Sequence, residues 1–414
     1  MHRAELLLAG DAPPAADTAL VSSPFDGSPL GSTERGDERH VEHALAVAYA
    51  RFRDRSAWLP VHERIAILDR LRELMQGQAE DLALQAAAEG GKPLVDSRVE
   101  VARAIDGVRI CTDVLRGDEG EVIPVASTAA GAGRLAFTVH EPCGVVVAVS
   151  AFNHPLNLIV HQVAAAVAAG CPVIVKPAGD TPLSCHRFVS LLHEAGLSRE
   201  WCQCLITQNN AVAEALVTDP RVGFFSFIGS ARVGWSLRAK LAPGTRCALE
   251  HGGVAPVVVH EDADIAQVTP SLLKGGYYHA GQVCVSVQRV FAERSVARRL
   301  AEALAGGADA LVIGDPRDAA TEVGPLIRPR EVERVHEWVT EAVDGGAELL
   351  TGGQRLSDST YACTVLFEPP ADARVSREEV FGPVVCVYPF THAQEAYARA
   401  NALPYAFQAA VFTA

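Results

Sequence analysis

The chain has 414 residues, of which 49% are hydrophobic and 21% are charged, and its formal net charge is −14. This length and apolar content allow one large core or two to three domains, and they exclude fibrous, repeat and disordered classes. No basic cluster accompanies the negative balance, which disfavours nucleic acid as a partner because counterion release requires clustered Lys and Arg.

The N-terminal stretch MHRAELLLAGDAPPAAD is too short and too acidic for a signal peptide. No run of about 20 apolar residues occurs, so no membrane span and no membrane partner is expected. The ten cysteines are irregularly spaced, and the pair Cys202 and Cys204 lacks the partners of a zinc site. We therefore expect no metal, and free thiols in a reducing, cytoplasmic location.

Apolar residues at helical spacing predict four packing helices, over residues 40–55, 64–78, 79–91 and 95–116. Residues 121–144 are rich in β-branched and small residues around a Gly-rich middle, which predicts two strands and a turn.

From residue 144 onward, apolar strands alternate with helices. The first series has strands at 144–150, 171–178, 202–208 and 222–230, with helices at 155–170, 181–196 and 211–219. A second series begins after the Gly-Gly break at 252–253, with a strand at 255–262, helices at 265–277, 296–304 and 328–343, and strands at 380–390 and 407–413. Uniformly apolar strands separated by helices predict parallel sheets covered on both faces.

Cys284 lies in HAGQVCVSVQR (279–289), in a short Gly/Gln turn ahead of an alternating apolar run. A thiol attacks a carbonyl only as the thiolate, which needs nearby backbone N–H groups or a helix dipole. A lone cysteine is more often a small buried hydrophobe, so both interpretations stay open on this residue alone. His279 raises the alternative of a Cys–His protease, which no Asn or Asp context supports.

Two polar residues lie at further breaks in the pattern. Glu250 precedes two glycines in ALEHGGVAP, and a carboxylate partly buried there would have the raised pKa of a general base; the alternative is a surface glutamate. Asn153, in SAFNHPLNL, follows the first parallel strand, where open α/β sheets bind ligands, and its amide can stabilise an oxyanion or cap the next helix.

Two other strand ends suit a nucleotide. Lys176 in VKPAGDTP can donate to ribose or phosphate, and Gly229 with Ser230 in FIGSARVG can bring backbone N–H groups to a pyrophosphate at a helix N-terminus. The second stretch is not G-x-G-x-x-G, so a solvated lysine and an ordinary strand-to-helix turn are the alternatives.

Together these stretches resemble the aldehyde dehydrogenase superfamily, in order and in spacing. The matching stretches are AFNHPLN, VKPAGDTPLS, FIGSARVG, LEHGG, GQVC, EVGPLI, EEVFGPVV and AFQAAVFT. The resemblance implies that Cys284 is the nucleophile, that Glu250 is the general base, and that Asn153 holds the oxyanion with the Cys284 backbone N–H.

The resemblance also implies NAD or NADP as the cofactor and a small aldehyde as the substrate. Lys176 would contact the adenosine ribose, with Ala178 and Gly179 beside it. Gly229 and Ser230 would meet the pyrophosphate. Glu379 of EEVFGP would bind the nicotinamide ribose, and Phe381 would pack near the nicotinamide.

The implied fold is α/β, with two doubly wound parallel-sheet domains and a small β oligomerisation segment. Residues 1–120 and 144–252 would form the dinucleotide-binding domain, 121–143 a β-hairpin for oligomerisation, and 253–414 the catalytic domain. The chain ends at AVFTA, without the C-terminal strand with which relatives pair subunits near residues 134–141. We expect an incomplete catalytic domain, and a homodimer or tetramer in the full-length form.

Several departures leave alternatives open. Gly179 stands where many NAD-preferring relatives carry Glu, which makes NADP tolerable, although Asp180 could partly restore repulsion of a 2′-phosphate. His251 either tunes Glu250 or only packs. The sequence assigns no arginine to a phosphate or carboxylate end of the substrate, so aliphatic, hydroxylated and semialdehyde substrates remain open. A non-catalytic binding relative and a coenzyme A-acylating enzyme are the competing functions.

Overall fold

A five-stranded parallel sheet forms the centre of the first lobe of the computed structural model, which describes residues 2–414. Its strand order is β10-β9-β6-β7-β8, so the chain begins in the middle and winds toward both edges. The strands are β6 (Val145–Val149), β7 (Val173–Lys176), β8 (Cys202–Cys204), β9 (Val222–Ile228) and β10 (Arg246–Glu250). This order places the carboxyl ends of β6 and β9 beside each other at the same edge of the sheet.

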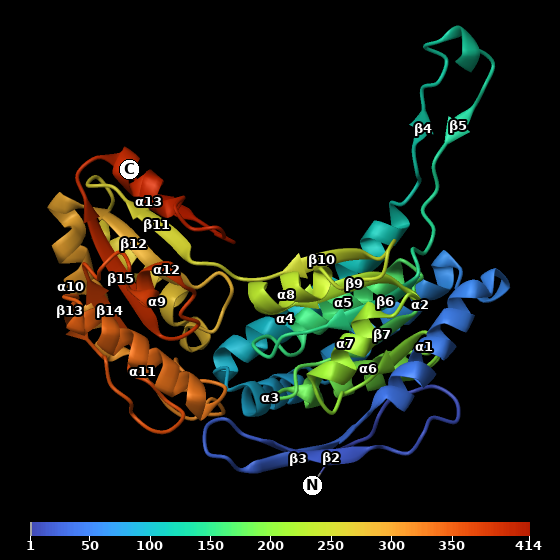
Figure 1. The fold of residues 1–414 in the computed structure, drawn as a ribbon, viewed down its shortest axis with the longest axis horizontal. Helices are drawn as coiled ribbons and strands as arrows, with labels where there is room; N and C mark the ends of the chain where they lie inside the picture. Colours follow the sequence, from blue (N-terminus) through green and yellow to red (C-terminus); the bar gives the residue numbers. More distant parts are fainter. Residues whose placement is uncertain (1) are drawn as a thin grey trace.

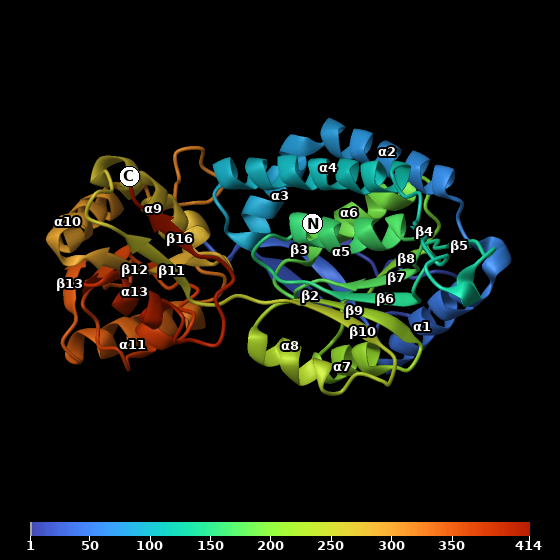
Figure 2. The ribbon, with the colours of Figure 1, turned by 90° about the horizontal axis from the view of Figure 1, so that it is seen from above.

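Alternate residues of β6 pack into two different cores. Val145 and Val147 join the core under α1, whereas Val146 and Ala148 join the core under α5. Figure 2 shows α2, α4, α5 and α6 over one face of the sheet and α1, α7 and α8 over the other. The bounds are α1 (Glu38–Arg53), η1 (Arg55–Ala57), α2 (Val61–Gly77), α3 (Ala79–Gly90), α4 (Leu94–Arg116), α5 (Asn157–Ala168), α6 (Pro182–Glu194), α7 (Asn210–Thr218) and α8 (Ala231–Arg238). A strand covered on both faces must be apolar throughout, as β6 is.

The second lobe is built on a six-stranded sheet of order β13-β14-β15-β12-β11-β16, in which only the β13–β14 pair is antiparallel. Its strands are β11 (Ala255–Val259), β12 (Val287–Glu293), β13 (Glu348–Thr351), β14 (Thr364–Phe367), β15 (Val384–Phe390) and β16 (Ala410–Phe412). Its helices are α9 (Ile265–Tyr277), η3 (Tyr278–Gly281), α10 (Arg294–Ala310), α11 (Pro329–Asp344), α12 (Arg374–Arg377) and α13 (Ala393–Ala400). Figure 1 shows this lobe beside the first, joined by the segment after β10.

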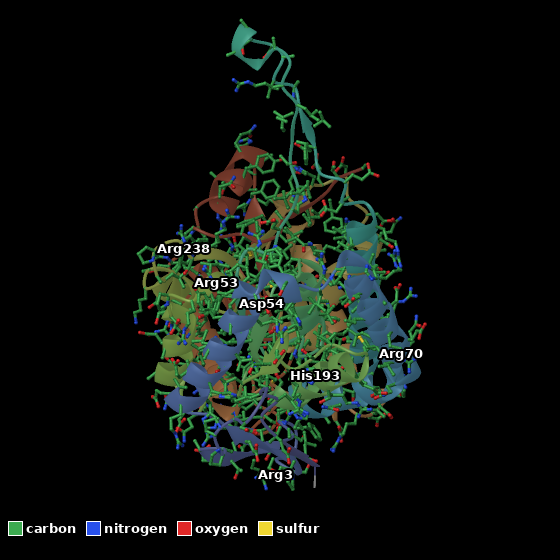
Figure 3. All side chains as sticks on the ribbon, turned by 90° about the vertical axis from the view of Figure 1, so that its right-hand side faces the viewer. Arg3, Arg53, Asp54, Arg70, His193 and Arg238 are labelled. Carbon is green, nitrogen blue, oxygen red and sulfur yellow. The ribbon has the colours of Figure 1, made fainter. Side chains whose placement is uncertain are left out.

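Two small sheets complete the molecule. The first, of order β1-β3-β2, lies along the first lobe near α6 (Figure 1) and consists of β1 (His2–Ala4), β2 (Asp17–Ser22) and β3 (Pro29–Arg35). The second is a hairpin of β4 (Val122–Ile123) and β5 (Ala136–Phe137), with η2 (Ala129–Gly131) at its tip. Figures 1 and 3 show the hairpin extending away from both lobes.

The predicted fold class, with two parallel sheets and a small β segment, is confirmed. The N-terminal strands, β10, β13 and β14 were not predicted from the sequence. β2 and β3 have mixed polar and apolar residues because their sheet buries only a few side chains, chiefly Ala4 and Val21 against Leu183. No helix within residues 2–414 is long and apolar enough to cross a membrane.

Candidate active site

A cavity of about 2080 Å³ opens between the two lobes. It is lined by the carboxyl ends of β6, β7, β9 and β10 and by segments of the second lobe. Its volume exceeds that of an ordinary small-molecule pocket and leaves room for a dinucleotide together with a small substrate. The lining includes all the site residues predicted from sequence: Asn153, Lys176, Ala178, Gly179, Gly229, Ser230, Glu250, Cys284, Glu379 and Phe381. The structure thus brings these residues together, and the role of each stays a prediction.

Cys284 follows a strained turn. His279 and Ala280 both have positive φ, of 50° and 54°, and Gly281 continues the turn with φ of 72°. A Cβ on Gly281 would lie 2.1 Å from the carbonyl oxygen of Gly382, so no other residue fits there. Positive φ is costly for residues other than glycine and persists only where the surroundings impose it, commonly at functional sites.

Gln282 fixes this turn to its surroundings. Its side chain donates to the carbonyl of Pro325 (3.1 Å) and accepts from the N–H of Ile327 (2.9 Å). Its own carbonyl accepts from Asn153 Nδ2 at 2.9 Å. Asn153 is buried and is not the N-cap of α5, which is Leu156, so the helix-cap interpretation of Asn153 is wrong. The amide from the end of β6 is instead tied to the loop two residues before Cys284.

The Cys284 thiol is half-buried and faces two carboxylates. Burial raises its pKa most, and the charges of Glu379 and Glu250 raise it further. Hydrogen bonds from the backbone N–H groups of Cys284 and Val285 act in the opposite direction. The same N–H groups that favour the thiolate are therefore present at the sulfur, as the sequence analysis required for a reactive cysteine.

Glu250 is the last residue of β10, and its side chain is exposed in the cavity. Of the two interpretations left open for Glu250, the exposed carboxylate agrees with the structure, because β10 is an edge strand and the chain leaves the sheet directly after Glu250. Its carbonyl accepts from the N–H of Gly229 at 3.0 Å, which joins the Glu250 strand end to the loop before α8. A carboxylate in this position is open to water.

Glu379 is more buried than Glu250. Burial raises the pKa of its carboxyl to about 7, against the opposing effects of Arg334 and the Gly253 N–H. A Cβ on Gly252 would lie 1.9 Å from Glu379 Oε1, so the glycine makes room for this carboxylate. Oε1 is buried with no hydrogen-bond partner among the described residues. A buried acceptor without a donor is costly, and a ribose hydroxyl would satisfy it.

At the end of β7, Lys176 is half-buried, and burial lowers the pKa of its ammonium group. Its Nζ donates to the Pro177 carbonyl at 3.0 Å. Gly179 is exposed, with open space where a side chain would be. The carboxylate of Asp180 pairs with Arg328, which lies at the start of α11 in the other lobe. The charge that the sequence analysis expected to repel a 2′-phosphate is thus partly neutralised by a residue 148 positions away.

Ser230 is the N-cap of α8, and its hydroxyl accepts from the N–H of Val233 at 3.4 Å. A Cβ on Gly229 would lie 2.7 Å from the ring of Phe227, which explains the glycine at this strand-to-helix junction. The α8 N-terminus faces the cavity through both residues. Free N–H groups at such a terminus are suited to bind an anion.

Two histidines near the site have packing roles. His251 contacts the rings of Tyr405 (4.6 Å between centroids) and Trp235, with Trp235 Nε1 donating to His251 Nε2 at 3.3 Å. His279 is fully buried, and neither of its ring nitrogens has a hydrogen-bond partner within residues 2–414. The protease alternative, which needs a His–Cys pair, therefore lacks its hydrogen bond.

Two features of the site were not predicted from the sequence: the role of Gln282 in fixing the turn before Cys284, and the backbone conformation of Phe381. Gln282 lies inside the GQVC stretch, so its place beside the nucleophile was a usable signal. Phe381 was predicted to pack near the nicotinamide, and the structure adds that it has positive φ (47°) and meets Phe152 edge-to-face at 5.9 Å.

Among residues 2–414, no group of three or more His, Cys, Asp or Glu could hold a metal ion.

The chain is similar in sequence to proteins of one known family. The family model described as the aldehyde dehydrogenase family matches residues 12–414. A 3-sulfolactaldehyde dehydrogenase from Priestia aryabhattai is 37% identical over 368 residues, which cover 89% of this chain and 76% of the relative.

Solved structures agree with the sequence relatives. An NAD-dependent aldehyde dehydrogenase from Sinorhizobium meliloti matches with a TM-score of 0.94 at 31% identity, covering 100% of this chain and 83% of its own. Glyceraldehyde-3-phosphate dehydrogenase GapN from Methanocaldococcus jannaschii, complexed with NADP, matches with a TM-score of 0.90 at 31% identity, covering 95% and 85%.

Proposed function

The chain belongs to the aldehyde dehydrogenase family, and from this premise we propose that it oxidises an aldehyde to a carboxylic acid with NAD or NADP, through a thiohemiacetal and a thioester on Cys284. The observation that carries the proposal is that Cys284, Glu250 and Asn153 line one cavity, with Asn153 bonded to the loop two residues before Cys284. Each group is common by itself; a thiol, a carboxylate and an amide around one open space are the parts of acyl chemistry.

In the first step, the Cys284 thiolate adds to the carbonyl carbon of the aldehyde. The carbonyl oxygen becomes an oxyanion, which accepts hydrogen bonds from the Cys284 backbone N–H and from Asn153 Nδ2. One hydrogen of the Asn153 amide already binds the Gln282 carbonyl. That bond orients the amide, and its second hydrogen is available to the oxyanion.

The residues present fit a dinucleotide, because Glu379 Oε1 is a buried acceptor without a donor. Glu379 would hold the nicotinamide ribose, Phe381 would pack on the nicotinamide, Gly229 and Ser230 would meet the pyrophosphate, and Lys176, Ala178 and Gly179 would line the adenosine ribose site. When bound, the nicotinamide supplies the hydride acceptor that the oxidation requires.

The thioester on Cys284 is released by water. Glu250, exposed in the cavity, removes a proton from a water molecule, which attacks the thioester carbonyl and releases the carboxylic acid. An enzyme that passes its acyl group to coenzyme A has less need of such a base. The position of Glu250 therefore supports hydrolysis over acyl transfer.

We also propose that both NAD and NADP are accepted. Gly179 leaves open space beside the adenosine ribose site, and Arg328 neutralises part of the Asp180 charge. The solved relatives named above include an NAD-dependent enzyme and an NADP complex. Initial rates with each cofactor test this; activity with NAD alone, at any NADP concentration, would contradict it.

For the hairpin we propose a role in binding a second copy of the chain, as expected for residues 121–143. Its apolar side chains are largely exposed, with Leu135 at 77% and Phe137 at 65%. Apolar surface of this extent on an extended arm is typical of a protein interface. Sedimentation of the double variant L135D/F137D should show smaller particles than the parent and than a control, L20D, changed at another exposed leucine.

The catalytic proposal is tested by replacing the nucleophile. Cys284→Ala should lower the rate of aldehyde-dependent NAD(P)H formation by roughly 10⁴-fold or more, because no other group forms the acyl bond. Cys111→Ala, at another half-buried free thiol outside the cavity, is the matched control. Equal rates for C284A and the parent would refute the proposal, and a rate that requires coenzyme A would identify an acylating enzyme instead.

A further inference from the structure

One arginine of α4 differs from the others on that helix. Three of the four arginines of α4 pair with a carboxylate: Arg98–Glu80, Arg109–Asp106 and Arg116–Asp69. Arg103 forms no hydrogen bond and no ion pair with any residue between 2 and 414, and it lines the cavity between the lobes. Arg103 is exposed to solvent at the rim of this cavity, and its lack of a counterion among the described residues is the feature to explain.

The carboxylates nearest to Arg103 on its own helix are already engaged. Glu100, one turn earlier, is fully buried and pairs with the fully buried Lys92. The other oxygen of Glu100 accepts from the N–H groups of Leu156 and Asn157, each at 3.0 Å, and so caps α5. Asp96, two turns before Arg103, pairs with Lys274 at 2.6 Å. Asp106, one turn after Arg103, pairs with Arg109. Each of these carboxylates is therefore balanced by another cation, which leaves Arg103 without a partner.

Two histidines and a tyrosine complete this end of the cavity. Arg103, His154, His161, Lys274 and Tyr278 line it, and we call them the α4–α5 end. The rings of His154 and Tyr278 stack, with centroids 6.1 Å apart. Burial lowers the pKa of both histidines most, and the Arg103 charge lowers it further. Both are therefore neutral near pH 7. His154 Nδ1 already bonds to Lys92 Nζ at 2.6 Å, so His154 Nε2 and the His161 ring are the nitrogens that remain for a ligand.

The α4–α5 end opens onto the catalytic residues. His154 follows Asn153, which holds the loop of the nucleophile through the Gln282 carbonyl. Tyr278 begins the 3₁₀ turn that leads to Cys284. Glu250 and His161 line the same cavity, and the Glu250 charge opposes the lowering of the His161 pKa by burial. An aldehyde whose carbonyl lies at Cys284 can therefore extend toward Arg103.

We propose that the substrate is an aldehyde with an anionic group at the end remote from the carbonyl, and that Arg103 binds this group while His154 and His161 flank it. The proposal rests on the function proposed above and adds the substrate class. A guanidinium offers a planar pair of donors that matches a carboxylate, a sulfonate or a phosphate, and the neutral histidines do not compete for its charge.

The same geometry disfavours two other substrate classes. A trimethylammonium or other cationic end would meet Arg103 as a like charge, and an alkyl end would leave the guanidinium without a partner. Arg232 is a further cation that lines the cavity with no ion pair in the described part of the chain, but it follows Ser230 on α8, at the proposed pyrophosphate site. Lys176 also lines the cavity without an ion pair in the described part of the chain, but it lies at the end of β7, at the proposed adenosine ribose site. Arg103 is thus the unpaired cation on the substrate side of the cavity.

The test compares aldehydes that differ mainly in their remote group. Initial rates would be measured for succinic semialdehyde, glyceraldehyde 3-phosphate, pentanal and betaine aldehyde with the parent, R103Q, R103K and the control R98Q. R98Q removes an α4 arginine that lies outside the cavity. For the preferred anionic aldehyde, R103Q should raise KM about 10- to 100-fold, R103K less, and R98Q not at all, while KM for pentanal stays within about twofold.

The outcomes separate this proposal from the proposed function. Oxidation of pentanal or betaine aldehyde at least as efficiently as both anionic aldehydes would overturn the substrate class and leave aldehyde oxidation intact. A preference for an anion that R103Q leaves unchanged would overturn the role of Arg103. Preference for only one of the two anions identifies carboxylate or phosphate recognition and supports the proposal. Absence of oxidation with every aldehyde would overturn the proposed function itself, and this inference with it.

Discussion

At the Cys284 end of the cavity two carboxylates face a thiol, and neither Glu250 nor Glu379 forms an ion pair within residues 2–414. At the α4–α5 end, by contrast, Lys92 pairs with Glu100 and Lys274 pairs with Asp96, so that Arg103 is the one charge left over. The first end has two carboxylates without an ion pair, and the second has one cation without an ion pair.

This difference separates side chains that can react with or bind a ligand from side chains that stabilise the fold. A buried ion pair is already satisfied and holds its elements in place, whereas a charged or polar group left without a partner has free capacity for a ligand. Glu379 Oε1 is an unpartnered group on one side, and Arg103 is an unpartnered group on the other. The comparison predicts that changes at paired residues act on stability and that changes at unpartnered residues act on catalysis or binding.

The largest effect on catalysis within this comparison is expected at Glu250. Glu250→Gln should lower steady-state turnover by about 10²- to 10⁴-fold, because water is no longer activated to release the acyl group. One equivalent of NAD(P)H per active site should still form rapidly, since oxidation precedes hydrolysis. Stopped-flow absorbance measures both phases, with Glu119→Gln, at an exposed glutamate outside the cavity, as the control. Loss of the rapid phase together with turnover would show that Glu250 acts before the thioester forms.

At the α4–α5 end, replacing Lys92 removes the buried ion pair with Glu100. Lys92→Met should lower the free energy of unfolding by about 3–5 kcal/mol, because it leaves the fully buried Glu100 carboxylate without its counterion. Chemical denaturation measures the change. Arg70→Met, in the exposed Arg70–Glu73 pair, should change stability little. Similar small losses in both variants would mean that the Lys92–Glu100 pair does not support the fold.

The smallest expected effect is a shift along the pH axis at Glu379. Its carboxyl has a pKa raised to about 7, so it gains negative charge as the pH rises through neutrality, and that charge opposes ionisation of Cys284. Glu379→Gln removes the charge and should lower the pKa of the Cys284 thiol. The rate of iodoacetamide alkylation against pH should therefore rise at lower pH in E379Q than in the parent. Glu378→Gln, at the exposed neighbouring residue, should give the parental curve; a curve for E379Q identical to the parent would contradict the contact.

Much of the fold was predictable because local pattern encodes it. The strand GVVVAVS is apolar at every position, as a strand must be when helices cover both of its faces, and β6 has that environment. The N-terminal strands were missed because their sheet buries few side chains, so that their sequences carry no clear alternation. The sequence left open whether Glu250 is partly buried or exposed, because its exposure depends on β10 being an edge strand.

In the candidate site, too, some residues could be predicted from local sequence and Arg103 could not. Its residues were found from short stretches whose order along the chain resembles one family, and all of them line one cavity. Arg103 could not be found this way, because in the sequence it looks the same as Arg98, Arg109 and Arg116 on the same helix. Only the positions of the surrounding carboxylates show that it is the arginine without a partner.

By itself, the sequence determined the alternation of strands and helices, the α/β class and the identity of the residues with reactive side chains. The tertiary structure alone decided that Arg328 neutralises Asp180, that Glu379 packs on Gly252 and that Arg103 has no partner. The physical reason is that hydrophobic periodicity acts over a few residues, whereas ion pairing and burial depend on groups that meet only when distant parts of the chain fold together.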